Sequence, residues 1–467
     1  MQLAEAQLAG SGKPLGIQRA ARIVRSVAGA GRTVAAAAGL AVFVGAFAGC
    51  GNQYRPVVSA INPVGPAGQP TKYAMAVSSA GPTSNGLVTM VDFSGDTVLI
   101  TATLGVNPYY FILNGGGTTG YTLNSDKTVN SFDVSTSLIS SQVLETTLLP
   151  GANPVSVFAG SSSTYIADPG IGGIDQMTGT PPALKQELPI GTGFSPIYVV
   201  GLAGAARAYA INQATGGGAG QVAAIETGGN TISTTLPVGR GPVYGVMTGD
   251  DRRAFILNQT DGTVTSINAV TNTLDSPVTT IPVGVRPVWA DLAPTRNELV
   301  VANEGSGTTP GSVSLVSISL CSTTALPTNP DCDPTNPVDA TSFGTVLATV
   351  PVGINPIMVS VLSDGTRAYV ANAGVAGLPC SPTGLPQTGY TTCTVSVVNL
   401  TSNTVTATIP IAGHPAYIAT SNSTPTGKVY VVCKDSQAMT VIETDTDSLD
   451  TTIPLQGYGV SVRMTQP

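Results

Sequence analysis

The sequence predicts an all-β protein assembled from one four-stranded unit that is repeated along the chain. Three observations support this fold class. A Pro-Val-Gly turn recurs, as in "TTIPVGVRPVWADL" (279–292) and "ATVPVGINPIMVS" (348–360). Apolar residues come in short runs between turn formers, and only 10% of the 467 residues are charged. Glycines (55) and prolines (35) are abundant, which is typical of short strands joined by tight turns.

The repeat has a measurable period. The second proline of each copy, here called the marker proline, is found at Pro108, Pro154, Pro196, Pro242, Pro287, Pro356 and Pro415, and Gly459 takes its place in the last copy. Successive intervals are 46, 42, 46, 45, 69, 59 and 44 residues. A period of 42–46 residues is typical of the blades of a β-propeller and not of helical solenoids.

Each unit also has a fixed internal order. An apolar strand follows the marker proline, then a polar turn, then a strand such as "AYVAN" (368–372), then a third strand such as "CTVSVVN" (393–399). A fourth strand ends in the next Pro-Val-Gly turn. Four short strands without a helical period predict a four-stranded blade. We expect the asparagines that end the second strands to hydrogen-bond the adjoining turns.

The segments "DGTRAYVAN" and "TVSVVNLTSNTVTATIPIAGHP" resemble the consensus of the YVTN-type β-propeller repeat family. The resemblance covers nearly all of residues 70–467 and implies a propeller. It implies little about activity, because that family includes surface-layer proteins, adhesion-like proteins and many of unknown role.

The unit count predicts eight blades. Fourth strands end at eight places between Gly105 and Gly457. The first unit starts at "TKYAMAV" (71–77) without an innermost strand, and "GVSVRM" (459–464) is an innermost strand without the rest of a blade. We expect the N-terminal outer strands and the C-terminal inner strand to pair and close the ring, which removes an exposed edge. The alternative is seven blades, with the irregular unit 154–191 folded differently.

The N-terminus has the pattern of an export signal. Basic residues from Lys13 to Arg32 precede the apolar stretch 34–47, which at about 14 residues is shorter than the roughly 20 that span a bilayer. "FAGC" (47–50) resembles the bacterial lipobox, although Phe47 stands where leucine is usual. The resemblance implies that Cys50 is lipid-modified. We therefore predict a signal peptide over 1–49, a tether over 50–69, and a single propeller domain over 70–467. The chain would be exported and lipid-anchored in the cell envelope, and Gly51 after the cysteine favours the outer membrane or cell surface.

The two long intervals, of 69 and 59 residues, contain four of the cysteines. Cys321 and Cys332 flank one proline-rich loop, and Cys380 and Cys393 flank another. Because disulfides form and persist in exported proteins, we predict one bridge within each loop. Cys433 is expected to be a small buried residue.

The loops with the marker prolines are expected to ring one mouth of the central channel. The residues just before the marker prolines differ between units, as a shaped pocket would require. They form the candidate ligand-binding rim: Asn107, Asn153, Ser195, Arg286, Asn355 and His414. Trp289, the single tryptophan, is expected between blades.

The sequence excludes some function classes and leaves others open. A net charge of −7 without basic clusters argues against nucleic-acid binding. His414 is the single histidine, and no serine or carboxylate pairs with it by spacing. We assign no catalytic residue, no metal site and no cofactor, and expect a monomer. The prediction is a cell-envelope lipoprotein whose propeller binds or supports a glycan, a peptide or another envelope protein. The alternatives are a lactonase-like hydrolase and a passive surface-layer spacer.

Overall fold

The computed structural model describes residues 72–320, 342–421 and 427–465 of the chain. The chain divides into two units, Met1–Gln69 and Pro70–Pro467, and all the described residues belong to the second. Within this described part, no helix is long and apolar enough to cross a membrane.

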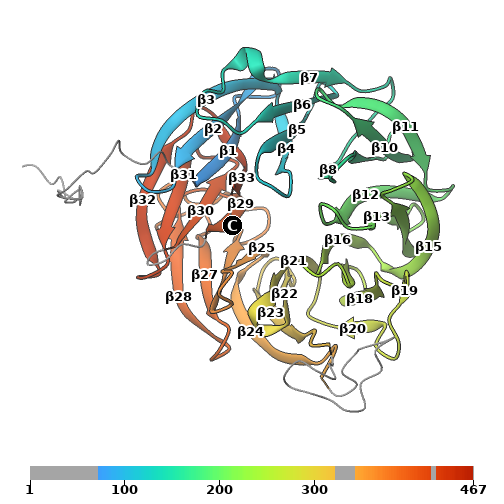
Figure 1. Cartoon of the computed structure of the whole chain (residues 1–467). Helices are drawn as coiled ribbons and strands as arrows, with labels where there is room; N and C mark the ends of the chain where they lie inside the picture. Colours follow the sequence, from blue (N-terminus) through green and yellow to red (C-terminus); the bar gives the residue numbers. More distant parts are fainter. Residues whose placement is uncertain (1–71, 321–341, 422–426, 466–467) are drawn as a thin grey trace, which may run out of the picture. The chain divides into compact units, whose positions relative to one another are not determined.

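The described strands form eight antiparallel sheets arranged in a ring, which is an eight-bladed β-propeller (Figure 1). Blade 1 is formed by β1 (Tyr73–Ser79), β2 (Asn85–Asp92), β3 (Thr97–Val106) and β33 (Tyr458–Met464). Blade 2 is β4 (Pro108–Leu113), β5 (Thr119–Asn124), β6 (Thr128–Asp133) and β7 (Leu144–Thr147). Blade 3 is β8 (Ser156–Ala159), β9 (Thr164–Asp168), β10 (Gly173–Thr178) and β11 (Ala183–Pro189). Blade 4 is β12 (Phe194–Gly201), β13 (Arg207–Ala214), β14 (Ala219–Glu226) and β15 (Thr231–Arg240).

Blade 5 is β16 (Pro242–Met247), β17 (Arg253–Asn258), β18 (Thr263–Asn268) and an interrupted outer strand, β19 (Thr273–Leu274) and β20 (Thr280–Pro282). Blade 6 is β21 (Pro287–Ala293), β22 (Glu298–Asn303), β23 (Pro310–Ser317) and β24 (Val346–Ile354). Blade 7 is β25 (Pro356–Val361), β26 (Arg367–Asn372), β27 (Cys393–Asn399) and β28 (Thr404–Ile411). Blade 8 is β29 (Pro415–Ser421), β30 (Lys428–Cys433), β31 (Ala438–Glu443) and β32 (Ser448–Pro454). Two 3-10 turns, η1 (Ser140–Gln142) and η2 (Pro294–Arg296), complete the described elements.

The predicted count and the predicted closure are both confirmed. Strand β33 pairs antiparallel with β1, with Ala74 opposite Met464 and Ala76 opposite Val462. The first and last parts of the propeller therefore share blade 1, seen in Figure 1 where β33 lies beside β1. The seven-blade alternative is wrong, because the irregular unit 154–191 forms a complete sheet of its own, blade 3.

The core lies between neighbouring blades. The second strands are buried on both faces, and every residue of β17, β22 and β30 is buried. One cluster joins Tyr209 and Ile211 of blade 4 to Ile256 of blade 5, and similar clusters follow around the ring. Because each sheet is covered on both faces by its neighbours, its inner strands are continuous apolar runs, while outer strands such as β15 and β28 alternate exposed with less exposed residues.

The recurring Pro-Val-Gly turn is explained by contacts between blades. In four of the turns, at Gly105, Gly239, Gly284 and Gly353, the glycine packs directly against the asparagine that ends the second strand of the next blade. A Cβ on Gly284 would lie 2.4 Å from the Asn303 side chain, and one on Gly353 would lie 2.6 Å from that of Asn372. These asparagines are buried, and Asn303 donates to the hydroxyls of Ser312 and Ser314 on the neighbouring strand at 3.2 and 3.0 Å. The turn is thus a packing device at these junctions, whereas a Cβ on Gly151 or Gly191 would meet nothing within 4 Å.

The marker prolines contribute to the same junctions. All seven are buried. A Cβ on Gly220 of β14 would lie 2.5 Å from the ring of Pro242, and one on Gly311 of β23 would lie 2.4 Å from that of Pro356. Pro108, Pro242 and Pro356 therefore each pack on a glycine in the third strand of the blade before, Gly86, Gly220 and Gly311.

We expect Gly284→Ala to destabilise the fold by about 1–3 kcal/mol, because the added methyl must displace the buried Asn303 side chain. The matched control is Gly216→Ala, where an added Cβ meets nothing within 4 Å. The control should change the free energy of unfolding by less than about 1 kcal/mol. Urea unfolding of both variants measures the difference, and equal midpoints would contradict this account of the turn.

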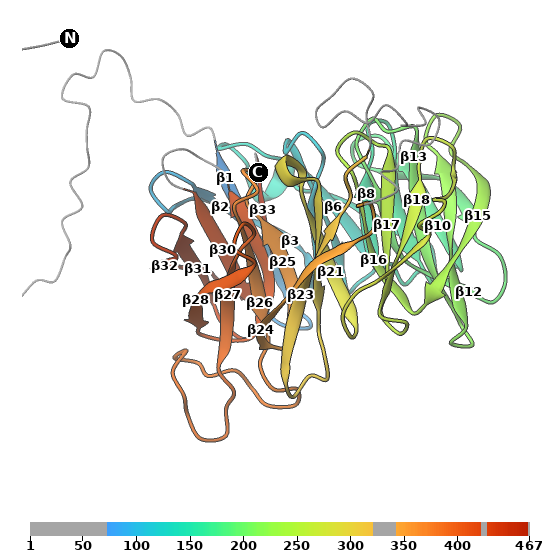
Figure 2. The ribbon, with the colours of Figure 1, turned by 90° about the horizontal axis from the view of Figure 1, so that it is seen from below.

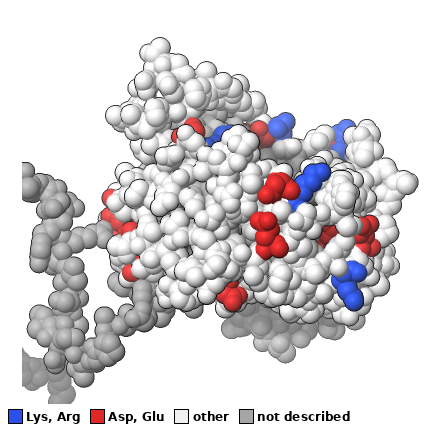
Figure 3. Space-filling model, turned by 90° about the horizontal axis from the view of Figure 1, so that it is seen from above, with Lys and Arg blue, Asp and Glu red and all other residues white. Residues whose placement is uncertain are grey.

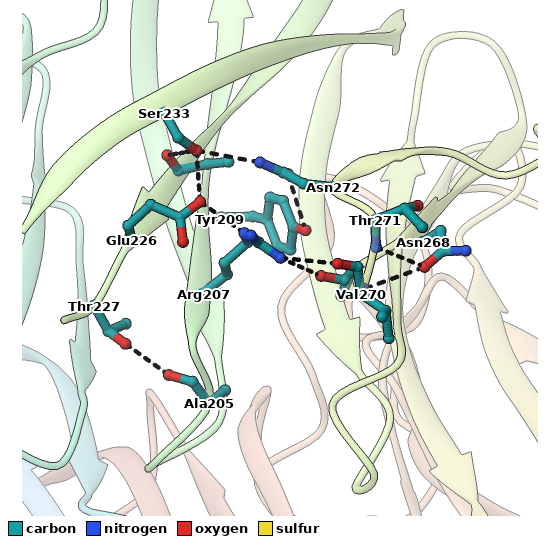
Figure 4. A network of polar contacts seen from close by, with 12 residues as sticks. Ala205, Arg207, Tyr209, Glu226, Thr227, Ser233, Asn268, Val270, Thr271 and Asn272 are labelled. Atoms are coloured by element: carbon teal, nitrogen blue, oxygen red, sulfur yellow. Dashed lines mark hydrogen bonds and ion pairs between the residues drawn. The ribbon is translucent and has the colours of Figure 1, made fainter. Parts of the chain in front are cut away.

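A second repeated contact joins the outer parts of the blades. In blade 4, Tyr209 donates its hydroxyl to Asn272 Oδ1 of blade 5 at 3.3 Å, and Arg207 donates to the carbonyls of Ala269 and Val270 at 2.8 and 3.2 Å (Figure 4). The same tyrosine-to-turn bond recurs in Tyr165–Asn230, Tyr369–Asp447 and Tyr430–Asp96. The basic residue two positions before the tyrosine repeats as well, because Arg367 pairs with Asp447 at 2.6 Å. The "RAY" part of the repeat is therefore an inter-blade contact.

Candidate functional site

Aromatic side chains recur at one position of the innermost strands, and four of them line the central channel. The residue two positions after the marker proline is aromatic in five units, at Tyr110, Tyr198, Tyr244, Trp289 and Tyr417. In each of these strands the pairing with the second strand shifts between the proline and this residue, which is a β-bulge. A bulge bends the strand and re-aims the side chains that follow it. These innermost strands lie nearest the centre of the ring (Figure 1).

A cavity of about 610 Å³ occupies the channel. Its lining combines Tyr198, Tyr244, Trp289 and Tyr417 with aliphatic residues of the same strands. The cavity also reaches the turns that join first to second strands, at Asn114, Gly117, Ala203, Pro294 and Ser363. These turns lie at the face opposite the proline loops, because they follow the C-terminal ends of the innermost strands.

The aromatic side chains form one connected cluster. The rings of Tyr244 and Trp289 stack with centroids 3.9 Å apart, and the ring of Tyr198 lies 4.9 Å from that of Tyr244. Trp289 meets Tyr417 edge to face at 5.8 Å. Such offset and edge contacts are favourable beyond the area they bury. Trp289 packs against the cores between neighbouring blades, as expected, and it also lines the channel.

Two charged side chains also line this cavity. Arg463 from β33 lies over the ring of Tyr417, with Cζ 4.1 Å from the ring centroid, and its Nε donates to the carbonyl of Phe111 at 3.4 Å. Asp291 from β21 accepts the backbone N–H of Leu292 on Oδ1 and that of Val361 on Oδ2, both at 2.8 Å. Burial raises the pKa of Asp291 to about 6, against the lowering effects of the two N–H bonds and of Arg463. The site therefore offers aromatic surface, one guanidinium and one carboxyl group.

The predicted rim residues lie at the other face. Asn107, Arg286 and Asn355 adopt the left-handed backbone conformation, with φ of 45°, 56° and 56°. Asn107 Oδ1 accepts the hydroxyl of Ser79 at 2.6 Å, and Arg286 pairs with Glu304 at 2.8 Å. Asn153 is exposed, while Ser195 is half-buried within β12.

His414 also lies in this face, and its pKa is lowered by burial. Its Nδ1 contacts the carbonyl of Pro415 at 3.0 Å. Beside it, a hollow of about 440 Å³ is lined by Pro379, Cys380, Tyr390, Asp435 and Tyr458. Several polar side chains of the rim thus bond to residues of the same face. Ligand binding at the rim stays a prediction.

The cysteine predictions are settled in part. Cys380 and Cys393 form the predicted disulfide in the loop between β26 and β27, which extends beyond the strand ends in Figure 2. Cys433 is free and 1% exposed, and burial raises the pKa of its thiol to about 12, as expected for a packing residue. Cys50, Cys321 and Cys332 lie outside the described residues.

Blade 3 contains a buried pair of carboxyl groups. Asp168 stands where other blades have the second-strand asparagine, and its Oδ1 accepts the N–H groups of Asn153 and Gly170 at 2.7 and 2.8 Å. Asp175 on β10 is hydrogen-bonded to Asp168 and is 3% exposed. Neither Asp168 Oδ2 nor Asp175 Oδ1 receives an N–H or O–H from the protein. A proton on Asp175, the form that burial favours, lets this carboxyl group donate to Asp168.

We expect this pair to make the fold less stable as pH rises through about 7. Burial, then the charges of Asp168 and Glu187, raise the pKa of Asp175 to about 7. The pKa of Asp175 is higher in the folded than in the unfolded protein. Its contribution to the free energy of unfolding is therefore complete below about pH 4 and lost near pH 7. Asp175→Asn, which keeps a hydrogen-bond donor, should remove this dependence and stabilise the protein by about 2 kcal/mol at pH 8. Denaturant unfolding from pH 5 to 8 tests it against the exposed Asp445→Asn control, and parallel pH profiles in all three proteins would contradict it.

Sequence reasoning missed the central site, although a signal was present. The aromatic residues occupy one position of the repeat, and Asp291 and Arg463 both lie four positions after their markers. When the innermost strands are aligned on their markers, the aromatic residues fall two positions and the charged residues four positions after the marker. Among residues 72–320, 342–421 and 427–465, no group of three or more His, Cys, Asp or Glu side chains is arranged to hold a metal ion.

Comparison with known proteins supports the fold alone. No protein-family model matches the sequence, and no curated protein matches it. Dihydro-heme d1 dehydrogenase NirN is similar in structure, with a TM-score of 0.57 and 11% identity over 87% of this chain and 78% of that one. Apo AztD from Citrobacter koseri has a TM-score of 0.54 and 10% identity over 84% of this chain and 97% of its own. At such identities the two proteins share the propeller architecture with this chain, and their functions differ from each other.

Proposed function

We propose that this protein is an envelope lipoprotein, anchored through Cys50, whose propeller is a binding module. The central cavity is the binding site in this proposal, in place of the proline-loop rim. The observation that carries it is the cluster of Tyr198, Tyr244, Trp289 and Tyr417 around a cavity of about 610 Å³. Ligand pockets commonly have volumes of about 300–1,000 Å³ and combine aromatic walls with a few polar groups.

The size and the place of the cavity limit the ligand. It accommodates a small molecule, or the terminal unit of a glycan or peptide, which enters between the turns that join first and second strands. The outside of the molecule is poor in charge on the face seen in Figure 3, where Lys, Arg, Asp and Glu are sparse. Because only 10% of the 467 residues are charged, the proposal rests on the cavity and not on attraction of ligand by a strongly charged surface.

The test is a glycan, peptide and small-molecule array probed with three proteins. These are the wild type, a cavity variant with Trp289→Ala and Tyr417→Ala, and a rim variant with Asn107, Arg286, Asn355 and His414 changed to Ala. The proposal expects binding that is lost in a still-folded cavity variant and kept in the rim variant. Binding lost only in the rim variant would move the site to the proline loops. Absence of binding, with ordered self-assembly or with hydrolysis of a lactone, would favour the spacer or the enzyme instead.

A further inference from the structure

We propose that the central cavity binds a free α-amino acid as its zwitterion, with the carboxylate on Arg463, the ammonium on Asp291 and the side chain among the aromatic rings. This inference rests on the proposed binding function and narrows it to one chemical class.

Arg463 has the capacity to hold a carboxylate. Its guanidinium stacks on Tyr417, and it donates to the Phe111 carbonyl and to the Tyr417 side chain. It forms no ion pair with any carboxylate of the described residues. Since a guanidinium has five N–H donors in a planar fork, donors remain for a ligand carboxylate.

Asp291 has the capacity to hold an ammonium group. Each of its oxygens accepts one backbone N–H, and a carboxylate oxygen has room for a second donor. The two N–H bonds fix the orientation of the group without neutralising its charge. An ammonium group supplies three donors and the opposite charge, which is what the free positions of Asp291 require.

The two charges face the channel from different sides of the ring. Asp291 belongs to blade 6 and Arg463 to blade 1, and blades 7 and 8 lie between them along the ring. Both residues lie four positions after the marker of their unit, so they stand at a similar depth. Against the raising effect of burial, the charge of Arg463 lowers the pKa of Asp291, so the two groups interact electrostatically, as the adjacent carboxylate and ammonium of an α-amino acid require.

The aromatic residues of the cavity also suit an amino acid. Trp289 lies two residues before Asp291 on β21, and its ring stacks on Tyr244. Aromatic faces attract an ammonium group and also accept an apolar side chain. The hydroxyls of a neutral sugar can hydrogen-bond the free positions of Arg463 and Asp291 but do not compensate their charges, and an anion or a cation alone would compensate only one of them. Charge that loses its water without compensation is costly, so a zwitterion fits this lining best.

The single tryptophan provides a direct measurement. Trp289 is the one tryptophan among 467 residues, so the intrinsic fluorescence of the full chain reports on this cavity. The detergent-solubilised full chain is titrated with each of the twenty standard L-amino acids and with neutral monosaccharides. For the amino acid that binds most tightly, the amine lacking the carboxylate and the acid lacking the ammonium are titrated next.

We expect a saturable change in Trp289 emission with at least one amino acid, and a loss of affinity of roughly 10- to 100-fold for each truncated analogue. In Arg463→Gln the zwitterion should bind no better than the amine, and in Asp291→Asn no better than the acid. Arg286→Gln, on the opposite face, is the matched control and should bind as the wild type does. The analogue series needs no variant, so it decides the case even if Arg463→Gln fails to fold.

Three results would overturn the inference. If monosaccharides change the emission and amino acids do not, the cavity is a binding site of another class and the proposed function stands. If the amine or the acid binds as tightly as the amino acid, the pairing of the two charges with a zwitterion is wrong. Absence of any response to the amino acids also refutes the inference, and the array decides separately whether the module binds anything.

Discussion

A chain that ends at Gly457 should lose cooperative unfolding. This change removes β33, which supplies the innermost strand of blade 1. Burial of Val462 and Met464 alone contributes about 3–6 kcal/mol, and the whole ladder from Ala74 to Ser79 loses its partner. The edge of β1 would then be exposed and available for pairing with other chains. Thermal unfolding followed by circular dichroism, with size-exclusion chromatography, measures both effects.

Ser461→Ala is the control for this deletion. Ser461 lies in the same strand and is 3% exposed, and its hydroxyl has no hydrogen-bond partner in the protein. Its replacement should leave stability unchanged or slightly raised. A truncated chain that stays monomeric and unfolds at the same temperature as the wild type would contradict closure by β33.

Loss of either member of the Lys428–Asp96 ion pair should cost about 3–5 kcal/mol. The pair joins blade 8 to the turn between β2 and β3 of blade 1, with Nζ 2.6 Å from Oδ2 and both side chains 6% exposed. Lys428 Nζ also donates to the carbonyl of Phe93 at 2.9 Å, and Tyr430 donates to the same Asp96. Asp96→Ala therefore leaves a buried ammonium group with one partner fewer, and Lys428→Ala leaves a buried carboxylate.

The double variant separates the pair from its surroundings. It should lose less stability than the sum of the two single changes, because neither charge is then left alone. Arg240→Ala is the matched control, since Arg240 pairs with Asp261 at 2.7 Å while 56% exposed, and should cost less than about 1 kcal/mol. Urea unfolding measures all four proteins. Additive losses in the double variant would show that Lys428 and Asp96 act independently.

The fold could be predicted because its signals are local and repeated. The spacing of the marker prolines and the order of apolar runs report the blade directly, and the unmatched ends at 71–77 and 459–464 report the closure. The contacts made by the Pro-Val-Gly turn and by the second-strand tyrosine could not be predicted. That Gly284 packs on Asn303, and that Tyr209 reaches Asn272, depends on how neighbouring blades approach each other. Sequence spacing within one unit does not contain that information.

The site was harder to predict because it is assembled from many units. Each inner strand supplies one or two side chains, and a bulge after the marker proline decides which of them enter the channel. Arg463 meets Tyr417 only because the last strand returns to blade 1, next to blade 8. The rim residues drew attention because they vary between units. Three of them, Asn107, Arg286 and Asn355, occupy left-handed turn positions, a backbone role that the variation does not distinguish from ligand contact.

The most direct test of the central site is a crystal structure of the protein grown with the tightest-binding compound of the array. The account predicts electron density for that compound in the central cavity, in contact with Trp289 and between Asp291 and Arg463. Density confined to the hollow beside the Cys380–Cys393 loop, with the central cavity free of the compound, would contradict it.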